Sequence, residues 1–97
     1  MSMKQGEREA MLLKMTVEEA REAQFQHGLE KYGEAGNWKA GNFVGNPLAH
    51  MFTELIDAMN YATVAHHKGM MDACKLRLCY DMMKVLAEAV QCMDLYQ

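Results

Sequence analysis

Apolar residues recur every three to four positions along most of the chain, which is the period of an amphipathic α-helix. Methionine, alanine and leucine are abundant, valine and isoleucine are few, and no stretch alternates apolar and polar residues as a half-buried strand does. The pattern therefore predicts an all-α fold, a small helical bundle with a short N-terminal helix and three main helices.

The first half of the predicted domain, which covers residues 1–97, contains two helical segments and a loop. Residues 1–15 are expected to form a short N-terminal arm or helix. Thr16 and Glu19 make a capping-box pattern that begins the first main helix, which ends near Tyr32. Four glycines between residues 33 and 45 then predict a long glycine-hinged loop.

The second half contains the other two main helices. Asn46 followed by Pro47 is typical of a helix start, and this helix is expected to run to Gly69. Residues 16–69 then form a helical hairpin around the loop. Residues 70–97 contain the third main helix, which follows the second through a tight turn at the glycine.

The expected core face of the second main helix is one broad apolar stripe, made by Leu48, Met51, Phe52, Leu55, Met59, Ala62 and Thr63. The third main helix is apolar over more than half of its circumference. Its apolar positions are Met71, Cys74, Leu78, Cys79, Met82, Val85, Leu86, Ala89, Val90 and Met93. One neighbouring helix cannot cover so wide an arc. We therefore expect a homodimer or homotetramer that completes the bundle, the alternative being a monomer whose N-terminal arm covers the extra face.

The charge and the cysteines exclude several classes of protein. A net charge of −3 argues against binding of a nucleic acid polymer, which needs a basic surface. No apolar stretch approaches the roughly 20 residues that span a bilayer, so no membrane partner is expected. Without a secretion signal, and with an odd number of cysteines (Cys74, Cys79 and Cys92), the expected location is the cytoplasm. The cysteines are expected to be small apolar residues on a packed helix, and His66 and His67 surface residues at a helix end.

Carboxylates gather at two places in the sequence. Glu54 and Asp57 share a helix stripe with His50 and Tyr61, and Glu18, Glu19 and Glu22 lie on the first main helix. In an antiparallel hairpin, Glu22 and the Glu54–Asp57 pair would lie at similar distances from the loop, with Gln26 and Glu30 as further candidates. Three or four such carboxylates suit Mg²⁺, which shares its coordination with phosphate oxygens. The alternative is a solvated acidic surface.

The loop and its borders combine aromatic rings, amides and lysines, which predict a nucleoside site. Its candidate residues are Lys31, Tyr32, Asn37, Trp38, Lys39, Asn42 and Phe43. Stacking of a base on Trp38 would contribute about 1 to 3 kcal/mol. An asparagine could read the base edge and a lysine could contact phosphate. The competing interpretation is that Trp38 and Phe43 only close the end of the bundle.

Together these segments resemble a known family. EExxE at Glu18 to Glu22, ExxD at Glu54 to Asp57, Tyr61, and the KYG…NW segment are similar to the MazG-like all-α nucleotide pyrophosphohydrolases, especially short phage-type members. The resemblance implies a helical dimer or tetramer that uses Mg²⁺ to cleave nucleoside triphosphates to monophosphate and pyrophosphate. By match, Glu18 or Glu19, Glu22, Glu54 and Asp57 would be metal ligands. One of the first-helix glutamates, Glu19 or Glu22, would orient the attacking water.

Three functions follow as hypotheses. The first is a Mg²⁺-dependent pyrophosphohydrolase with Lys31, Tyr32, Asn37, Trp38, Lys39 and Tyr61 as substrate-binding residues. The second is a non-catalytic protein that binds nucleotides or sequesters a nucleotide-derived signal, which would not need four competent metal ligands. The third is a helical interaction module without a ligand, in which the acidic residues are only surface.

Overall fold

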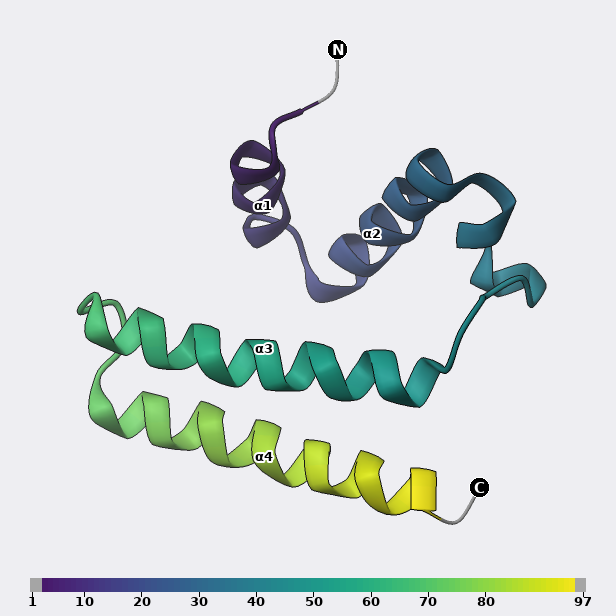
Figure 1. Cartoon of the computed structure of the whole chain (residues 1–97). Helices are drawn as coiled ribbons and strands as arrows, with labels where there is room; N and C mark the ends of the chain where they lie inside the picture. Colours follow the sequence, from purple (N-terminus) through teal and green to yellow (C-terminus); the bar gives the residue numbers. More distant parts are fainter. Residues whose placement is uncertain (1–2, 96–97) are drawn as a thin grey trace. The chain divides into compact units, whose positions relative to one another are not determined.

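The computed structural model describes residues 3–95, and the side chains of residues 3–93. Within this range it contains four α-helices, two short 3₁₀ turns and no strand, so the predicted all-α class is confirmed (Figure 1). The elements are α1 (Gln5–Leu13), α2 (Val17–Tyr32), η1 (Gly33–Gly36), η2 (Trp38–Ala40), α3 (Pro47–His67) and α4 (Ala73–Leu95). By contacts the chain divides into two compact units, unit 1 (Met1–Gly45) and unit 2 (Asn46–Gln97). That they fold as one domain, and that oligomerisation completes it, stay predictions.

The helix at the centre of unit 1 begins and ends as the sequence predicts. The Thr16 hydroxyl accepts a hydrogen bond from the Glu19 backbone N–H at 3.1 Å, and the Glu19 carboxylate accepts one from the Thr16 N–H at 2.9 Å. This capping box satisfies two N–H groups that have no partner within the helix. α2 ends at Tyr32, where Gly33 has a φ of 60°, a value that glycine adopts without steric cost.

The glycine-rich segment after α2 contains more regular structure than a plain loop. It forms η1 and η2, and η1 packs back against α2. The contact is close, because a Cβ added at Gly36 would lie 2.8 Å from the backbone carbonyl carbon of Gly28. Only a residue without a side chain can therefore occupy position 36 in this arrangement. This contact fixes where the segment that carries Trp38 starts.

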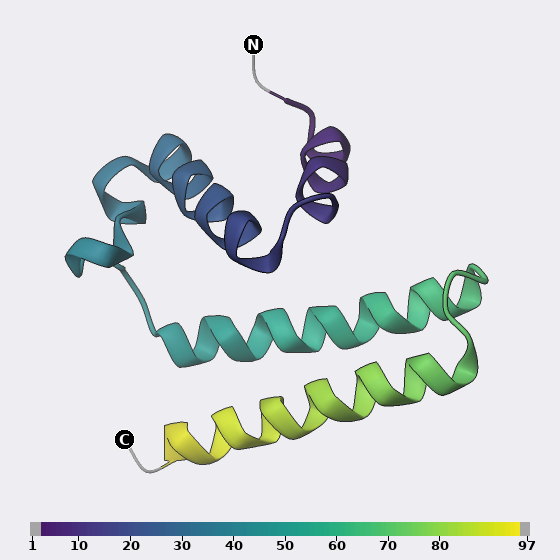
Figure 2. The same cartoon turned by 180° about the vertical axis from the view of Figure 1, so that it is seen from behind.

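Unit 2 is a hairpin of α3 and α4, which lie side by side in both views (Figures 1 and 2). The Asn46 side chain accepts hydrogen bonds from the first free N–H groups of α3, at 3.0 Å from Leu48 and 3.3 Å from Ala49. The predicted connection at Gly69 is confirmed, and its φ is 75°. The predicted boundaries at this turn differ from the structure by two residues at the end of α3 and by three at the start of α4. α3 already ends at His67, and α4 begins only at Ala73, after Asp72, whose carboxylate accepts a hydrogen bond from the Lys75 N–H at 2.8 Å.

The described core of unit 2 is thin. Its buried apolar residues are Met59 and Ala62 on α3, and Ala87 and Val90 on α4. Most of the predicted α3 face is buried or half-buried, but Met51 is 47% exposed and lies outside it. α4 leaves a second apolar stripe exposed, which we call the outer face of α4: Leu78, Met82, Val85, Leu86 and Met93. The predicted excess of apolar surface on this helix is therefore present.

Candidate functional site

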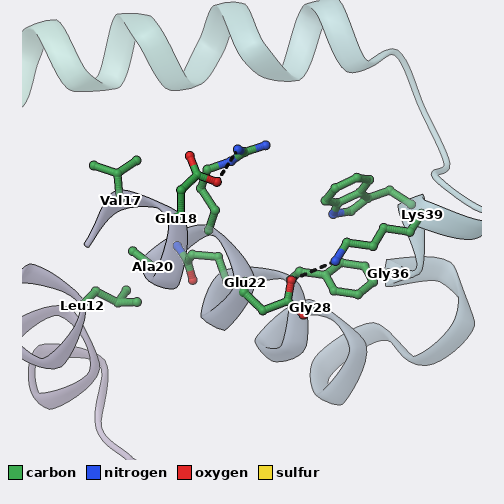
Figure 3. Close-up of a pocket in the computed structure, with 12 residues that line it drawn as sticks. Leu12, Val17, Glu18, Ala20, Glu22, Gly28, Gly36 and Lys39 are labelled. Carbon is green, nitrogen blue, oxygen red and sulfur yellow. Dashed lines mark hydrogen bonds and ion pairs between the residues drawn. The ribbon is translucent and has the colours of Figure 1, made fainter. Parts of the chain in front are cut away.

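An open pocket of about 670 Å³ lies in unit 1, between α2, the end of α1 and the two 3₁₀ turns (Figure 3). Apolar side chains line part of it, namely Leu12, Val17, Phe25 and Trp38. Charged side chains line the rest, namely Glu18, Arg21, Glu22 and Lys39. The pocket thus offers both an apolar surface and charges of both signs, a combination that suits a ligand with a flat apolar part and a charged part.

Two aromatic rings form the apolar end of this pocket. The ring centroids of Phe25 and Trp38 are 5.1 Å apart and their planes meet at 71°, an edge-to-face contact. Phe25 is buried, and packing against it orients the indole. Trp38 keeps half of its surface exposed, so part of the ring remains open for stacking.

Lys39 joins the aromatic end of the pocket to the acidic one. Its Nζ lies 4.2 Å from the centroid of the Phe25 ring and 5.6 Å from that of Trp38, within cation–π range. The same Nζ donates a hydrogen bond of 2.8 Å to Oε2 of Glu22, drawn as a dashed line in Figure 3. The lysine is therefore held at a fixed place in the pocket, although its side chain is 46% exposed.

Glu22 carries a charge that its neighbours stabilise. The Lys39 ammonium, and after it the Gln26 amide at 3.1 Å, hold the pKa of the Glu22 carboxyl below its ordinary value. The carboxylate therefore stays ionised well into the acidic range. Because both partners are exposed, the Lys39–Glu22 ion pair can exchange Glu22 for another anion at small cost.

The other glutamates of the first cluster are also engaged. Glu18 pairs with Arg21 at 2.9 Å on the exposed surface of α2. Glu19 closes the capping box, and the hydrogen bond from the Thr16 backbone N–H, followed by that of its hydroxyl, lowers the Glu19 pKa. This contact gives Glu19 a structural task at the start of α2. Its assignment as a catalytic residue, and that of Glu18 as a metal ligand, stay predictions.

The second acidic pair lies on α3 in unit 2. Glu54 and Asp57 are one helical turn apart and both are exposed, as are His50 and Tyr61 on the same stripe. Neither carboxylate forms a hydrogen bond or ion pair with a described residue of unit 2. Within the described part of either unit, no three His, Cys, Asp or Glu side chains form a metal-binding group. The predicted four-carboxylate set draws on both units and stays a prediction.

Of the predicted substrate-binding residues, only Trp38 and Lys39 line the pocket. Lys31 lies over the ring of its neighbour Tyr32, with 5.3 Å from Nζ to the centroid, and both are exposed. The backbone carbonyl of Asn37 accepts a hydrogen bond from the Ala40 N–H at 3.1 Å, so this residue holds η2 together. The Asn42 amide donates to Glu34 at 3.4 Å. Tyr61 belongs to unit 2 and is 72% exposed.

Phe25 and Arg21 are among the pocket residues that sequence reasoning missed. A signal for them exists, since Arg21 and Glu22 lie three and four positions after Glu18, and Phe25 lies four and three positions after Arg21 and Glu22, so that all four share one side of α2. Phe25 was overlooked because a single aromatic residue on a helix is usually core. Here it is core and also the support on which Trp38 rests.

Two expectations for unit 2 are wrong in part, although His67 is exposed as expected. His66 is half-buried rather than a surface residue, and its Nδ1 lies 2.8 Å from the carbonyl oxygen of Met71, across the turn between α3 and α4. The cysteines are free, but only Cys79 is half-buried, whereas Cys74 and Cys92 are exposed. Cys74 and Cys92 lie outside the α3–α4 contact, because the part of the α4 surface that packs on α3 is narrower than its apolar arc.

No protein-family model, curated protein or solved structure matches the chain. Among residues 3–95, no helix is both long enough and apolar enough to cross a bilayer. The residues themselves therefore carry the functional interpretation.

Proposed function

We propose that the chain is a nucleotide-binding protein that hydrolyses a nucleoside or deoxynucleoside triphosphate to monophosphate and pyrophosphate with Mg²⁺. The observation that supports this most is the meeting of Trp38, Lys39 and Glu22 in one pocket, on the support of Phe25. An aromatic face next to a cation is the pair of features that a base with attached phosphates requires. The proposed location is the cytoplasm, which is that of the host if the gene is phage-encoded.

Trp38, Lys39 and Glu22 each have a task in this proposal. A base stacks on the exposed half of Trp38, and the phosphates attract the ammonium of Lys39. Phosphate then replaces Glu22 as the partner of Lys39, which the exposed ion pair permits. Loss of that partner raises the pKa of Glu22 toward its ordinary value and makes its carboxylate a better base.

The proposed metal ligands are Glu54 and Asp57. Two carboxylates one turn apart, without a partner in unit 2, repel each other until a cation neutralises them. Two carboxylates, with water and phosphate oxygens completing the shell, are a usual set for Mg²⁺, so these residues fit the ion. When bound, Mg²⁺ offsets the negative charge of the phosphates and of the leaving pyrophosphate.

The chemical step needs no protein nucleophile. A water oxygen forms a bond to the α-phosphorus, the bond to the bridging oxygen of the pyrophosphate breaks, and a carboxylate accepts the proton of the water. The family resemblance implies that a glutamate of α2, among Glu18, Glu19 and Glu22, accepts this proton. Glu22 is the one whose basicity depends on Lys39 and hence on the arrival of a phosphate.

The test is release of pyrophosphate from a panel of ribo- and deoxynucleoside triphosphates, with and without Mg²⁺. We expect release that needs Mg²⁺ and falls at least about 100-fold in the Glu54→Gln/Asp57→Asn variant, because loss of a residue that only supports a metal ligand already costs about 10- to 100-fold. Glu88→Gln, which removes an exposed carboxylate of α4, is the matched control and should stay within twofold of the unmodified chain. A folded protein that releases no pyrophosphate from any nucleotide contradicts the catalytic proposal.

One observation favours the second candidate, a non-catalytic nucleotide binder. Glu22 is already occupied by Lys39 and Gln26, and a binder would need it only to position the lysine. In that case, the Glu54→Gln/Asp57→Asn variant binds nucleotide as the unmodified chain does, without Mg²⁺ and without turnover. The fluorescence of Trp38, the single tryptophan of the chain, measures this binding directly.

We further propose that the chain forms a homodimer or homotetramer through the outer face of α4. Five large apolar side chains of this face are each at least about half exposed, and burying such a stripe against a second copy removes it from water. The hydrophobic effect favours this by about 25 cal/mol per Å² of apolar surface.

A further inference from the structure

Arg8 on α1 is a charged residue in a place that usually holds an apolar one. It is only 8% exposed and is the buried charged residue of the described chain. Its backbone N–H continues the helix through a bond of 2.9 Å to the Lys4 carbonyl, but its guanidinium forms no hydrogen bond or ion pair with another described residue. A guanidinium does not lose its proton in proteins, and none of the Arg8 nitrogens is fully enclosed. Most of the side chain is therefore buried, while the charge keeps an opening to solvent and has no counter-charge among the described residues.

Arg8 is one of the residues that line a second pocket. This pocket has a volume of about 380 Å³ and lies between α1 and α2. It is lined by Met3 and Met11 of the N-terminal segment, besides Arg8, and by Ala23, Gln26, His27 and Glu30 of α2. None of these residues lines the Trp38 pocket, so the two pockets are separate.

We propose that this second pocket binds a small organic anion, a carboxylate or a phosphate monoester, through the guanidinium of Arg8. The planar fork of arginine matches two oxygens of either group, and an anion supplies the missing counter-charge. Met3 and Met11 offer an apolar surface to the body of the ligand, and His27 offers a further polar contact. The proposal does not depend on the nucleotide function.

Removal of the Glu30 charge distinguishes two possible partners of Arg8, an external anion and Glu30 itself. It is the carboxylate among the residues that line the pocket, and it is not paired with Arg8 in the structure. If an external anion is the partner of Arg8, Glu30 repels it, and removal of the Glu30 charge strengthens binding. If Glu30 is itself the partner in solution, removal of its charge destabilises α1 and no anion site exists.

The experiment uses the full chain and three probes of similar shape: benzoate, phenyl phosphate and the neutral benzamide. Binding is followed through the Nε–Hε resonance of Arg8 and the ring resonances of His27. We expect saturable shifts with an anion and none with benzamide. Shifts with benzoate alone or with phenyl phosphate alone support the site and identify its anion class.

The variants give the matching controls. Arg8→Met keeps the apolar stem and should weaken anion binding by at least about tenfold, a loss of about 1.4 kcal/mol, whereas Lys4→Met and Trp38→Ala should leave it within twofold. Glu30→Gln should tighten binding. If Arg8→Met fails to fold, Arg8→Lys keeps the charge, loses the fork and should bind more weakly.

Four outcomes overturn the proposal. They are unchanged binding in the arginine variants, equal binding of benzamide, no binding of either anion, and a Glu30→Gln variant that binds less tightly. The Trp38→Ala control separates this result from the fate of the nucleotide proposal.

Discussion

Lys39 Nζ lies 2.8 Å from Oε2 of Glu22, although the two residues are 17 positions apart in the sequence. The pair ties η2 to α2 and places the lysine over the ring of Phe25. Trp38 lies directly beside it in the chain and is the single tryptophan, so its fluorescence reports whether η2 is in place.

Acid should release η2 from α2. The pKa of Glu22 is lowered by Lys39 and then by Gln26, so the contribution of this contact to stability is complete above the ordinary glutamate value and is lost as the pH falls through the lowered one. We expect a change in Trp38 emission with a midpoint below the ordinary glutamate range. The transition should disappear in Glu22→Gln and persist in Glu19→Gln, whose carboxylate also has a lowered pKa but caps the far end of α2. The same midpoint in Glu22→Gln would assign the transition to another group.

Alanine should have opposite effects at two glycines. At Gly36 a methyl group would clash with the Gly28 backbone. Separation of η1 from α2 should then destabilise unit 1 by about 1–3 kcal/mol. At Gly28 a methyl group meets nothing within 4 Å, so removing a glycine from the interior of α2 should stabilise it by about 0.5–1 kcal/mol. Thermal unfolding followed by circular dichroism and by Trp38 emission measures both. Equal melting temperatures for the two variants would mean that η1 does not rest on α2.

Two valines of α4 should respond differently to shortening. Val90 is 3% exposed and faces α3, so Val90→Ala should cost about 2 kcal/mol through lost burial and a small cavity. Val85 is 64% exposed, and Val85→Ala should change the stability of the hairpin by less than about 0.5 kcal/mol. Urea unfolding at low protein concentration gives both values. A larger loss at Val85 would show that another chain covers it even under dilution.

Trp38 and Lys39 should contribute to nucleotide affinity through different parts of the ligand, the base and the phosphates. Trp38→Ala should weaken binding of a triphosphate and of its nucleoside alike, by about 1–3 kcal/mol. Lys39→Met should weaken the triphosphate by about tenfold more than the nucleoside, the value of a charge-assisted contact of about 1.5 kcal/mol. Any loss shared by both ligands reports the release of η2 from Glu22. Calorimetry measures both ligands. Lys31→Met is the control, since Lys31 is exposed and does not line the pocket. A loss at Lys31 equal to that at Lys39 would move the phosphate site to the end of α2.

Charge on the outer face of α4 should separate the copies of the chain. Met82 and Val85 are 59% and 64% exposed, so Met82→Lys/Val85→Lys should keep the hairpin folded. Sedimentation should show an oligomer for the unmodified chain and a monomer for the variant, since a buried lysine without a partner is costly. Leu13→Lys is the control because Leu13 is 87% exposed but lies in unit 1. A monomeric unmodified chain would contradict the oligomer prediction.

The sequence predicts the elements well because their start and end signals are local. The capping box at Thr16, the Asn46–Pro47 helix start and the positive φ of Gly69 depend only on residues within one helical turn. The end of α3 and the start of α4 are predicted less well. There, a hydrogen bond between His66 and Met71 and a cap at Asp72 stabilise a wider turn than the single glycine indicates.

The site is harder to predict because its contacts join residues that are distant in the sequence. Trp38 and Lys39 were identified from residue type alone, and both line the pocket. Their partners, Phe25 and Glu22, depend on how η1 folds back on α2, and this is set by the close approach of Gly36 to Gly28. A glycine in a loop indicates flexibility as readily as close packing, so sequence alone does not distinguish the two.

The methionines of unit 2 differ in their access to oxidants. Met82 and Met93 on the outer face of α4 are 59% and 53% exposed, whereas Met59 in the core is 8% exposed. Peroxide converts an apolar thioether to a polar sulfoxide, which is unfavourable in an apolar contact. In the monomer, ageing in air would therefore make this face polar before oxidation reaches the interior, and reductase treatment would restore it. In the proposed oligomer, the second copy would shield these methionines.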